Sequence, residues 1–417
     1  MKIWQRIRNH PSLGLVLLAY IAFVALGMPD GLLGVAWPSI RAGHALPLDA
    51  VGLLITATVA GYTTSSFLSG PLMARLGVGR LLAYSCALSG AGLIGYTLVP
   101  QWWMMVALGV LAGLGAGAID AGLNTYVAAN LSEGLMQWLH ACYGIGVTLG
   151  PLIMTYGLAI WDRWQVGYLA VGLFELALAL TFALTLPLWS ARPAAEAPRL
   201  TDYRTPMLET LRLPQAWTGA LLFFLYVGAE ASLGTWTYSL LTGSRGIDAR
   251  TAGLYAGGYW AMFTVGRAAA GFYARRAGPR LLVIGGLLGA LAGSGLLAWN
   301  PFPASSLIAV GLVGLSIAPI FPALMSDTSE RVSPRHAANT IGMQMATTGL
   351  GMAAIPGLMG VLARRISLEV IPVVLFVVYA AFLAVYTGSV VSQARARRAA
   401  APAGGAIPVE AEPGARR

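Results

Sequence analysis

Five ionisable residues stand inside long apolar stretches of this 417-residue sequence: Asp30, Asp120, Glu175, Glu230 and Arg267. Placing a charged side chain at the centre of a bilayer costs about 2.5–3.5 kcal/mol on insertion scales, so such residues are expected to face an interior path. Carboxylates in that setting can bind a proton, a metal cation or a cationic substrate. The chemistry they offer is therefore binding and release.

Asp120 combines an acid with an amide on one helix face. Asn124 follows it by four residues, so the two side chains lie one turn apart. Gly109, Gly113 and Gly117 precede them at the same spacing, a pattern typical of close helix packing. A low-dielectric site favours the neutral form of a carboxyl group, which suits a residue that takes up and releases a proton. We expect Asp120 to carry the proton and the glycines to serve packing.

Asp30 follows a proline in the run Gly27–Gly31. Pro29 removes the backbone hydrogen bond to the carbonyl of Ala25, and the flanking glycines loosen the helix locally. A carboxylate beside such an opening suits substrate binding or protonation. The alternative is that Asp30 only satisfies the freed backbone groups.

Glu230 and Arg267 carry opposite charges on consecutive apolar runs. They are expected either to form a buried ion pair that fixes helix register or to bind a ligand. Glu175 has no polar neighbours in the sequence, which favours a structural role. Proton coupling is accordingly assigned to Asp120, Asp30 and Glu230.

His140 stands next to Tyr143 and the glycine-rich segment that ends at Pro151. A lone histidine in a helix is equally consistent with a core residue and with a ligand-binding group. Aromatic rings and neutral amides are what a polyhydroxylated ligand requires, although membrane-interface belts and interhelical contacts use the same residue types. The expected substrate-binding residues are Asp30, Trp37, Asn124, His140, Tyr143, Glu230, Trp236, Tyr255, Trp260, Asn339 and Gln344.

The composition sets the environment of these residues. The chain is 57% hydrophobic and only 10% charged, whereas a soluble protein carries roughly 25% charged residues. Its mean hydropathy is +0.71. Cys86 and Cys142 both lie in apolar runs and give neither a disulfide framework nor a metal-ligand spacing. The sequence predicts an integral, all-α membrane protein.

Twelve stretches reach the length of about 20 mostly apolar residues that a spanning helix needs. The first continues through Pro29 and Asp30 without a small-residue cleavage site, so it is not expected to be a cleaved signal peptide. The predicted spans are residues 13–40, 50–74, 79–99, 102–130, 135–160, 165–189, 214–242, 250–274, 279–299, 304–326, 338–362 and 368–391.

The basic residues choose the orientation of these spans. Of 26 lysines and arginines, 19 fall at the termini and in the even-numbered connections, 6 on the other side, and Arg267 inside a span. The positive-inside rule then places both termini in the cytoplasm, so the net charge of +10 reports topology. Residues 190–213 are expected to be a cytoplasmic linker between six-helix halves, 1–189 and 214–394. Residues 395–417 are expected to be a disordered tail.

The two halves repeat each other at an offset of about 200 residues. Asp30 and Trp37 of the first span correspond to Glu230 and Trp236 of the seventh. The segment Gly70–Arg80 corresponds to Gly271–Arg280, and glycine pairs with a following proline recur in spans 5 and 11. Duplicated halves that rock against each other are a known arrangement for alternating access. Asp120 has no acidic counterpart near Phe321, which argues against a purely structural role.

The basic glycine loop after span 2, its copy after span 8 and the six-plus-six plan resemble the major facilitator superfamily over nearly the whole chain. The resemblance implies that the loops form a cytoplasmic gate, with Arg75, Arg80 and Arg276 as gating residues and Arg267 as a structural one. The family places an acid just before the first arginine of this loop. Here that position is Ala74.

A narrower resemblance is carried by Asp120–Asn124, Leu139–Pro151 and Tyr226–Trp236. These segments are similar to the sugar-porter branch around the fucose–proton symporters and the sodium-dependent glucose transporter-like proteins. In that branch an acid of span 1 and a glutamate of span 4 handle sugar and protons, and they map onto Asp30 and Asp120. A glutamine and an asparagine of span 5 map onto His140 and Tyr143.

Two functions remain open. The first is a proton-coupled secondary transporter of a small polar solute, foremost a sugar, with sodium as an alternative ion. The second is a proton-driven exporter of amphipathic or cationic compounds. A lipid-modifying enzyme is disfavoured because the sequence holds no catalytic or metal constellation, and a membrane receptor because a sensor would not need two pseudo-equivalent acids. The sequence also holds no nucleotide-binding loop, which argues against an ATP-driven pump. We expect a monomer in the cell inner (plasma) membrane, in contact with lipid, with no cofactor, no metal site and no nucleic-acid partner.

Overall fold

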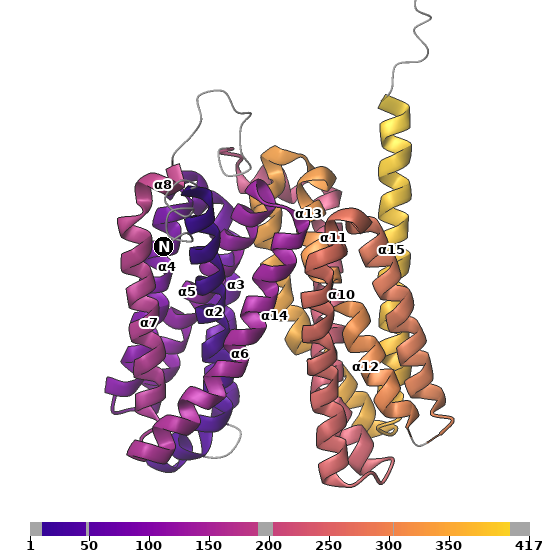
Figure 1. Ribbon diagram of the computed structural model, residues 1–417, viewed down its shortest axis with the longest axis horizontal. Coiled ribbons are helices and arrows are strands. Elements are labelled where there is room, and N and C mark those ends of the chain that lie inside the picture. The colour runs from indigo at the N-terminus through magenta and orange to yellow at the C-terminus, as the bar shows by residue number, and fades with distance from the viewer. Residues whose placement is uncertain (1–10, 47–49, 191–202, 303, 401–417) are drawn as a thin grey trace, which may run out of the picture.

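The computed structural model describes residues 11–46, 50–190, 203–302 and 304–400, and all regular elements within them are helices (Figure 1). The N-terminal half contains α2 (Pro11–Gly43), α3 (Val51–Leu76), α4 (Val78–Leu98), α5 (Trp102–Asn130), α6 (Glu133–Trp161) and α7 (Gln165–Leu184). Two short helices follow, α8 (Leu186–Ser190) and α9 (Met207–Leu211). The C-terminal half contains α10 (Pro214–Gly243), α11 (Ala249–Trp299), α12 (Ser305–Ile317), α13 (Ile320–Val332), α14 (Pro334–Arg365) and α15 (Val370–Ala400).

The long helix α11 is two spans. Its apolar stretch Leu254–Trp299 has 46 residues. At 1.5 Å per residue this is about 69 Å, roughly twice the thickness of a hydrocarbon core. Gly278, with φ 72° and ψ 160°, breaks the helix just before Pro279. The described residues thus form eleven apolar helices long enough to cross a membrane, and dividing α11 at Gly278 gives the twelve predicted spans.

The same turn stands at the matching place of the N-terminal half. Gly77, between α3 and α4, has φ 76° and ψ 162°, nearly the values of Gly278. A positive φ favours glycine because a Cβ would clash with the backbone. The repeat read from the segments Gly70–Arg80 and Gly271–Arg280 is therefore also a repeat of backbone conformation.

Glycines set the spacing of α5 against α3. A Cβ added to Gly113 would collide with the backbone carbonyl of Thr58, and one added to Gly117 would collide with that of Tyr62. The predicted glycine stripe thus allows the two helices to approach closely. This contact brings Tyr62 against the face of α5 that carries Asp120.

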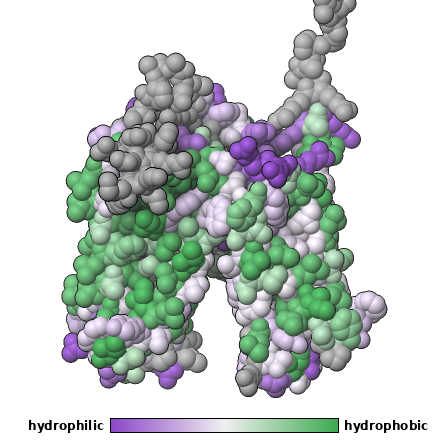
Figure 2. All heavy atoms as spheres, viewed as in Figure 1, coloured by the Kyte–Doolittle hydropathy of each residue, from purple (hydrophilic) through white to green (hydrophobic). Residues whose placement is uncertain are grey.

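The halves meet at one end and part at the other. Figure 2 shows a deep cleft between them that is open at the end opposite α8. We call the end with α8 and α9 the linker end and the opposite one the open end. Contacts between the halves lie toward the linker end: a Cβ on Gly70 would meet Asn339, one on Gly134 would meet Gly271, and one on Gly342 would meet the carbonyl of Ser66.

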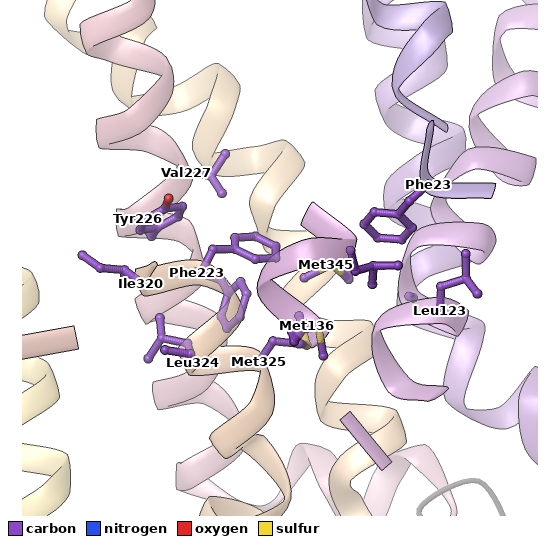
Figure 3. Close-up of a cluster of buried hydrophobic side chains, with 14 of the residues drawn as sticks. Phe23, Leu123, Met136, Phe223, Tyr226, Val227, Ile320, Leu324, Met325 and Met345 are labelled. Atoms are coloured by element: carbon purple, nitrogen blue, oxygen red, sulfur yellow. The ribbon is translucent and has the colours of Figure 1, made fainter. Parts of the chain in front are cut away.

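A hydrophobic cluster closes the cleft on the linker side. Figure 3 shows Met136 and Met345 near its middle, with Phe23 and Leu123 to one side and Phe223 and Tyr226 to the other. Phe23, Leu123 and Met136 belong to the N-terminal half and the others to the C-terminal half, and all are buried. The closed end is therefore packed as a core, with side chains from both halves.

On the side shown in Figure 2, large apolar side chains cover much of the surface of both halves between their two ends. Leu180, Leu184 and Phe272 are 61%, 74% and 77% exposed. Exposed large side chains in such number are unfavourable in water and are expected against lipid tails. The chain is a multi-pass membrane protein.

Two boundaries differ from the sequence prediction. α15 continues to Ala400, so residues 395–400 of the predicted tail are helical, and residues 401–417 lie outside the described residues. The linker 190–213 contains the helix α9, and its residues 191–202 also lie outside the described residues. Arginine and alanine are good helix formers, which allows α15 to extend past its apolar stretch.

Candidate functional site

Asp120 is the centre of a hydrogen-bonded group on α5. The hydroxyl of Tyr62 donates to its Oδ2. The Nδ2 of Asn124 donates to its Oδ1 at 2.7 Å and to its backbone carbonyl at 3.0 Å. The four-residue spacing predicted this pairing of acid and amide. Among the ion pairs formed by the described residues, none includes Asp120.

Asn124 links this acid to His140 of α6. Because the Nδ2 of Asn124 donates to two oxygens of Asp120, its Oδ1 is the atom that faces His140 Nε2, at 3.0 Å. An amide oxygen only accepts, so Nε2 carries the hydrogen in this arrangement. The imidazole ring lies edge-on between Phe23 and Phe321, with ring centroids 5.3 Å and 4.7 Å away.

Asp30 of α2 lies close to this group. Tyr143 of α6 donates its hydroxyl to Asp30 Oδ2 at 2.5 Å. Asp30 lies near Asp120, as a second acid of the same region. It is also exposed. Since its neighbours face the interior, the exposed surface of Asp30 belongs to the cleft.

Arg267 of α11 joins the two halves. One of its terminal nitrogens donates to the backbone carbonyl of His140 at 3.4 Å, and the other lies 4.0 Å from Glu230 Oε2. The guanidinium stacks on Phe263 with 4.1 Å between Cζ and the ring centroid. Its Nε is buried and has no hydrogen-bond partner in the structure. The predicted pairing of Glu230 with Arg267 is present, at the outer limit of an ion pair.

Hydrogen bonds connect Tyr62, Asp120, Asn124 and His140, and the backbone carbonyl of His140 leads on to Arg267 and Glu230. The pair of Asp30 and Tyr143 lies beside this chain of contacts, with Tyr143 one turn from His140 on α6. We call these eight residues the central network. Its members come from six helices: α2, α3, α5, α6, α10 and α11.

Other predicted binding residues lie away from the network. Trp37 is buried and packs on Trp102. Asn339 sits at the linker end, where it donates to the carbonyl of Thr205 and the hydroxyl of Thr210, both at 3.0 Å. Gln344 is buried and accepts from Thr328 at 3.1 Å. The structure gives each of these side chains a packing or hydrogen-bonding partner outside the network.

The aromatic residues of the C-terminal half are divided. Trp236 donates to the carbonyl of Pro356 at 3.0 Å and is held inside its own half. Trp260 is 43% exposed and lies edge-on to Tyr259, with ring centroids 4.8 Å apart. Tyr259 in turn donates to the backbone carbonyl of Glu230 at 3.0 Å. Tyr255 is half-buried on the same helix, α11.

The remaining predicted residues are placed as follows. Glu175 is 1% exposed between α4 and α7, outside the network. Arg75, Arg80 and Arg276 are exposed near the Gly77 and Gly278 turns at the linker end.

Sequence reasoning missed Tyr62 and Tyr259. Tyr62 opens a run of hydroxyl residues, Tyr62–Ser66, in an otherwise apolar helix. That run was a usable signal, because a polar face in a spanning helix points inward. Tyr259 carried no such mark, since tyrosines are also frequent at membrane interfaces.

Within the described ranges, no three histidine, cysteine or acidic side chains come together as metal ligands would. The network offers carboxylates, hydroxyls, one amide, one imidazole and one guanidinium. This set can bind protons, a small cation and a hydroxylated or charged solute.

The sequence of this chain is similar to those of known proteins along most of its length. The chain is 23% identical to Bypass of stop codon protein 6 of Saccharomyces cerevisiae, over 91% of this chain and 84% of that one. It is 23% identical to Sodium-dependent glucose transporter 1A of Mus musculus, over 82% and 88% of the two chains.

The structure superposes on that of the fucose–proton symporter of E. coli with a TM-score of 0.71 and 16% identity, over 88% of this chain and 97% of the other. The likeness is one of fold. The family model described as Major Facilitator Superfamily matches residues 19–356, with a second match over 237–410. A chain with these matches, two repeated halves and a central cleft belongs to the Major Facilitator Superfamily of transporters.

Proposed function

We propose that this secondary transporter moves a small polar solute, foremost a sugar, by alternating access coupled to protons. The observation that carries the proposal is the central network at the bottom of the cleft, and within it the position of Asp120. The network places a candidate proton site, Asp120, beside groups that could bind a substrate.

Asp120 and Glu230 differ in the charged groups around them. Glu230 has Arg267 at 4.0 Å, so a cation of the protein itself balances its charge. Asp120 has only neutral donors, Tyr62 and Asn124, and a second acid, Asp30, nearby. Two carboxylates close together in a low-dielectric site repel, and a bound proton or small cation relieves that repulsion. We assign the coupling proton to Asp120, with Asp30 as its partner at the cleft.

The substrate class follows from the groups around this acid. The buried Nε of Arg267 is unpartnered and can donate to a solute, whereas the donors of Tyr62, Tyr143 and Asn124 are directed at Asp120 and Asp30. A solute with several hydroxyl groups can accept from Arg267 and can donate to the carboxylates and to the tyrosine oxygens. The names of the mouse relative and the E. coli structural neighbour, a glucose and a fucose transporter, support a sugar. They differ in the coupling ion, sodium in one and a proton in the other.

The orientation is also a proposal. The basic residues gather at the linker end, with Arg75, Arg80, Arg275 and Arg276 all exposed there, and the positive-inside rule puts such an end in the cytoplasm. The open cleft then faces outward, in the inner or plasma membrane. Residues 1–189 and 214–394 act as the two rocking halves.

The test is solute uptake into proteoliposomes that contain the full chain. Labelled monosaccharides are supplied under an inward proton gradient, and separately under an inward sodium gradient, with wild type, Asp120→Asn and Glu175→Gln. Glu175→Gln is the matched control because it neutralises a buried acid outside the network. We expect the proton gradient to drive accumulation of one sugar in wild type and in the control. Asp120→Asn is expected to lose at least tenfold of that accumulation while it keeps sugar exchange at equal concentrations.

Three results would overturn parts of this proposal. Accumulation driven by the sodium gradient alone would show that sodium, and not a proton, is the coupling ion. Accumulation by Asp120→Asn equal to that of wild type would remove Asp120 as the coupling residue. Transport of a lipophilic cation against the gradient, with no sugar moved, would establish the exporter alternative.

A further inference from the structure

A cavity of about 330 Å³ lies outside the central network, at the seam between the halves. Its walls come from the first turns of α6, with Ser132 and Trp138, and from the linker-side end of the first span of α11, with Gly271, Phe272, Arg275 and Arg276. We call it the seam pocket. It forms where the backbones of α6 and α11 approach closely at Gly134 and Gly271.

The seam pocket has the electrostatics of an anion site. Arg275 and Arg276 are both exposed, and neither takes part in an ion pair with a described residue. Guanidinium groups are strong ligands for phosphate because their N–H donors match two oxygens at once.

The helix start of α6 adds to this field. Ser132 is the N-cap of this 29-residue helix, yet its side chain makes no capping hydrogen bond, so its hydroxyl is free to donate. A helix N-terminus also favours an anion through its unsatisfied N–H groups. Glu133 in the same turn does not line the cavity, and its Oε1 is buried.

The surroundings of the pocket are those of a membrane interface. Phe272 is 77% exposed and Tyr273 is 45% exposed. The ring of Trp138 lies edge-on to Phe272, with centroids 5.4 Å apart. Aromatic side chains gather where acyl chains meet headgroups, and here they stand directly beside two arginines.

We propose that the seam pocket binds the phosphate of an anionic phospholipid from the leaflet at the linker end. Arg275 and Arg276 are its cationic ligands, Ser132 is a hydroxyl donor, and Phe272 with Trp138 contacts the upper acyl chain. A free phosphate compound would satisfy the arginines equally well. The exposed aromatic wall favours the lipid, because a soluble ligand gains little from it.

The test measures binding of dioctanoyl-phosphatidylglycerol to the full-length protein in a neutral detergent. It compares wild type with the pair Arg275→Gln/Arg276→Gln and with the matched pair Arg75→Gln/Arg80→Gln. The matched pair removes the same charge from the same end of the molecule, outside the pocket. We expect the pocket pair to bind at least tenfold more weakly and the matched pair to bind as wild type does.

Dioctanoyl-phosphatidylcholine and glycerol 3-phosphate complete the comparison. We expect both to bind at least tenfold more weakly than the phosphatidylglycerol. Equal weakening by the two arginine pairs would overturn the pocket in favour of general surface charge. Equal binding of phosphatidylcholine would remove the anion requirement, and equal binding of glycerol 3-phosphate would make the ligand a soluble phosphate.

A charge-preserving variant protects this test against misfolding. Arg275→Lys/Arg276→Lys keeps both charges but loses the paired N–H donors, so it is expected to bind more weakly than wild type by less than tenfold, with an unchanged thermal midpoint in detergent. If the glutamine pair is unfolded, lipid binding by Ser132→Ala and by the lysine pair tests the proposal instead. Loss of binding by more than tenfold in the lysine pair, with no effect of Ser132→Ala, would contradict a phosphate held by these three side chains.

Discussion

The amide of Asn124 connects the acid of the N-terminal half to the imidazole that faces the other half. Its nitrogen is committed to Asp120 and its oxygen to His140 Nε2. A change in the hydrogen bonding of Asp120 therefore alters the hydrogen bond between Asn124 and His140. The backbone carbonyl of His140 accepts in turn from Arg267. His140 acts here as a neutral donor on one side and as a packing residue between Phe23 and Phe321 on the other.

This assignment predicts different results for two substitutions of His140. Glutamine supplies an N–H donor of similar reach, so His140→Gln is expected to keep most of the wild-type stability. His140→Leu removes the donor and leaves the buried Oδ1 of Asn124 unpaired, which destabilises the folded protein by about 1–3 kcal/mol. Unfolding of the purified protein in detergent measures both. Similar losses in the two variants would show that ring packing, and not the donated hydrogen bond, is what His140 provides.

At the scale of elements, the turn between α10 and α11 is held to the α14–α15 turn by one arginine. Arg245 donates to both carboxylate oxygens of Glu369, at 3.0 Å and 2.7 Å. It also donates to the hydroxyl of Ser306 at 2.8 Å and to the carbonyl of Leu297 at 2.7 Å. Its side chain is 6% exposed, while that of Glu369 is 42% exposed. This cluster holds the open end of the C-terminal half together.

The cluster predicts a dependence of stability on pH. The hydrogen bond from Arg245 is the main cause that lowers the pKa of Glu369 from its ordinary 4.5. The ionised form of Glu369 is therefore favoured more in the folded protein than in the unfolded chain. The stability that Glu369 contributes is present above pH 4.5 and is lost as the pH falls below it, through the lowered pKa. Because Glu369 is well exposed, the contribution is about 0.2–1 kcal/mol after screening by solvent.

Thermal unfolding between about pH 6 and pH 3 measures this effect. Glu369→Gln is expected to lower the midpoint at pH 6 and to approach wild type at pH 3. Glu330→Gln, at an exposed acid of α13, is the control and is expected to follow wild type throughout. A constant difference between Glu369→Gln and wild type over this range would exclude the ionic contribution.

The elements were largely predictable from sequence, and the site only in part. Apolar length located the spans, and the repeated glycine loops predicted two turns that share one conformation at Gly77 and Gly278. Local spacing also predicted the contact of Asp120 with Asn124, since both lie on one helix. The partners Tyr62, Phe321 and Arg267 come from other helices, and their approach depends on helix rotation and on the relative position of the halves. Asn339 and Trp37 lie away from the network for the same reason, because a polar or aromatic residue type does not reveal which neighbour it meets.

For the whole molecule, the central network and the seam are mechanically linked. The hydrogen bond from Arg267 to the carbonyl of His140, and the contact of Asn124 Nδ2 with Met345 Sδ at 3.8 Å, both cross between the halves. Opening of the linker end must break them. A change in charge at Asp120 therefore alters contacts that hold the present conformation, which is the link that coupled transport requires.

The two glycines of α14 allow this conformational balance to be tested. A Cβ on Gly342 would collide with the carbonyl of Ser66 in the opposite half, and a Cβ on Gly351 would collide with the carbonyl of Phe224 in the same half. Overpacking of this kind costs about 1–3 kcal/mol. In Gly342→Ala, separation of the halves at the linker end relieves the strain. The conformational equilibrium is therefore expected to shift by roughly 5- to 150-fold toward the conformation in which the halves part at the linker end and meet at the opposite end. In Gly351→Ala the strain persists in both conformations, so thermal stability falls while the balance stays unchanged.

Distances between spin labels at the open end distinguish these outcomes. Labels are attached through Trp161→Cys at the end of α6 and Ile366→Cys at the end of α14, both exposed positions, in a background without Cys86 and Cys142. The shorter distance is expected to gain population in Gly342→Ala and to stay at the wild-type level in Gly351→Ala. A shift of equal size in both variants would mean that crowding loosens the helix generally. No shift in either would mean that the contact between α3 and α14 does not hold the linker end closed. That role would then fall to the hydrophobic cluster around Met136 and Met345 and to the contacts that Arg267 and Asn124 make across the halves.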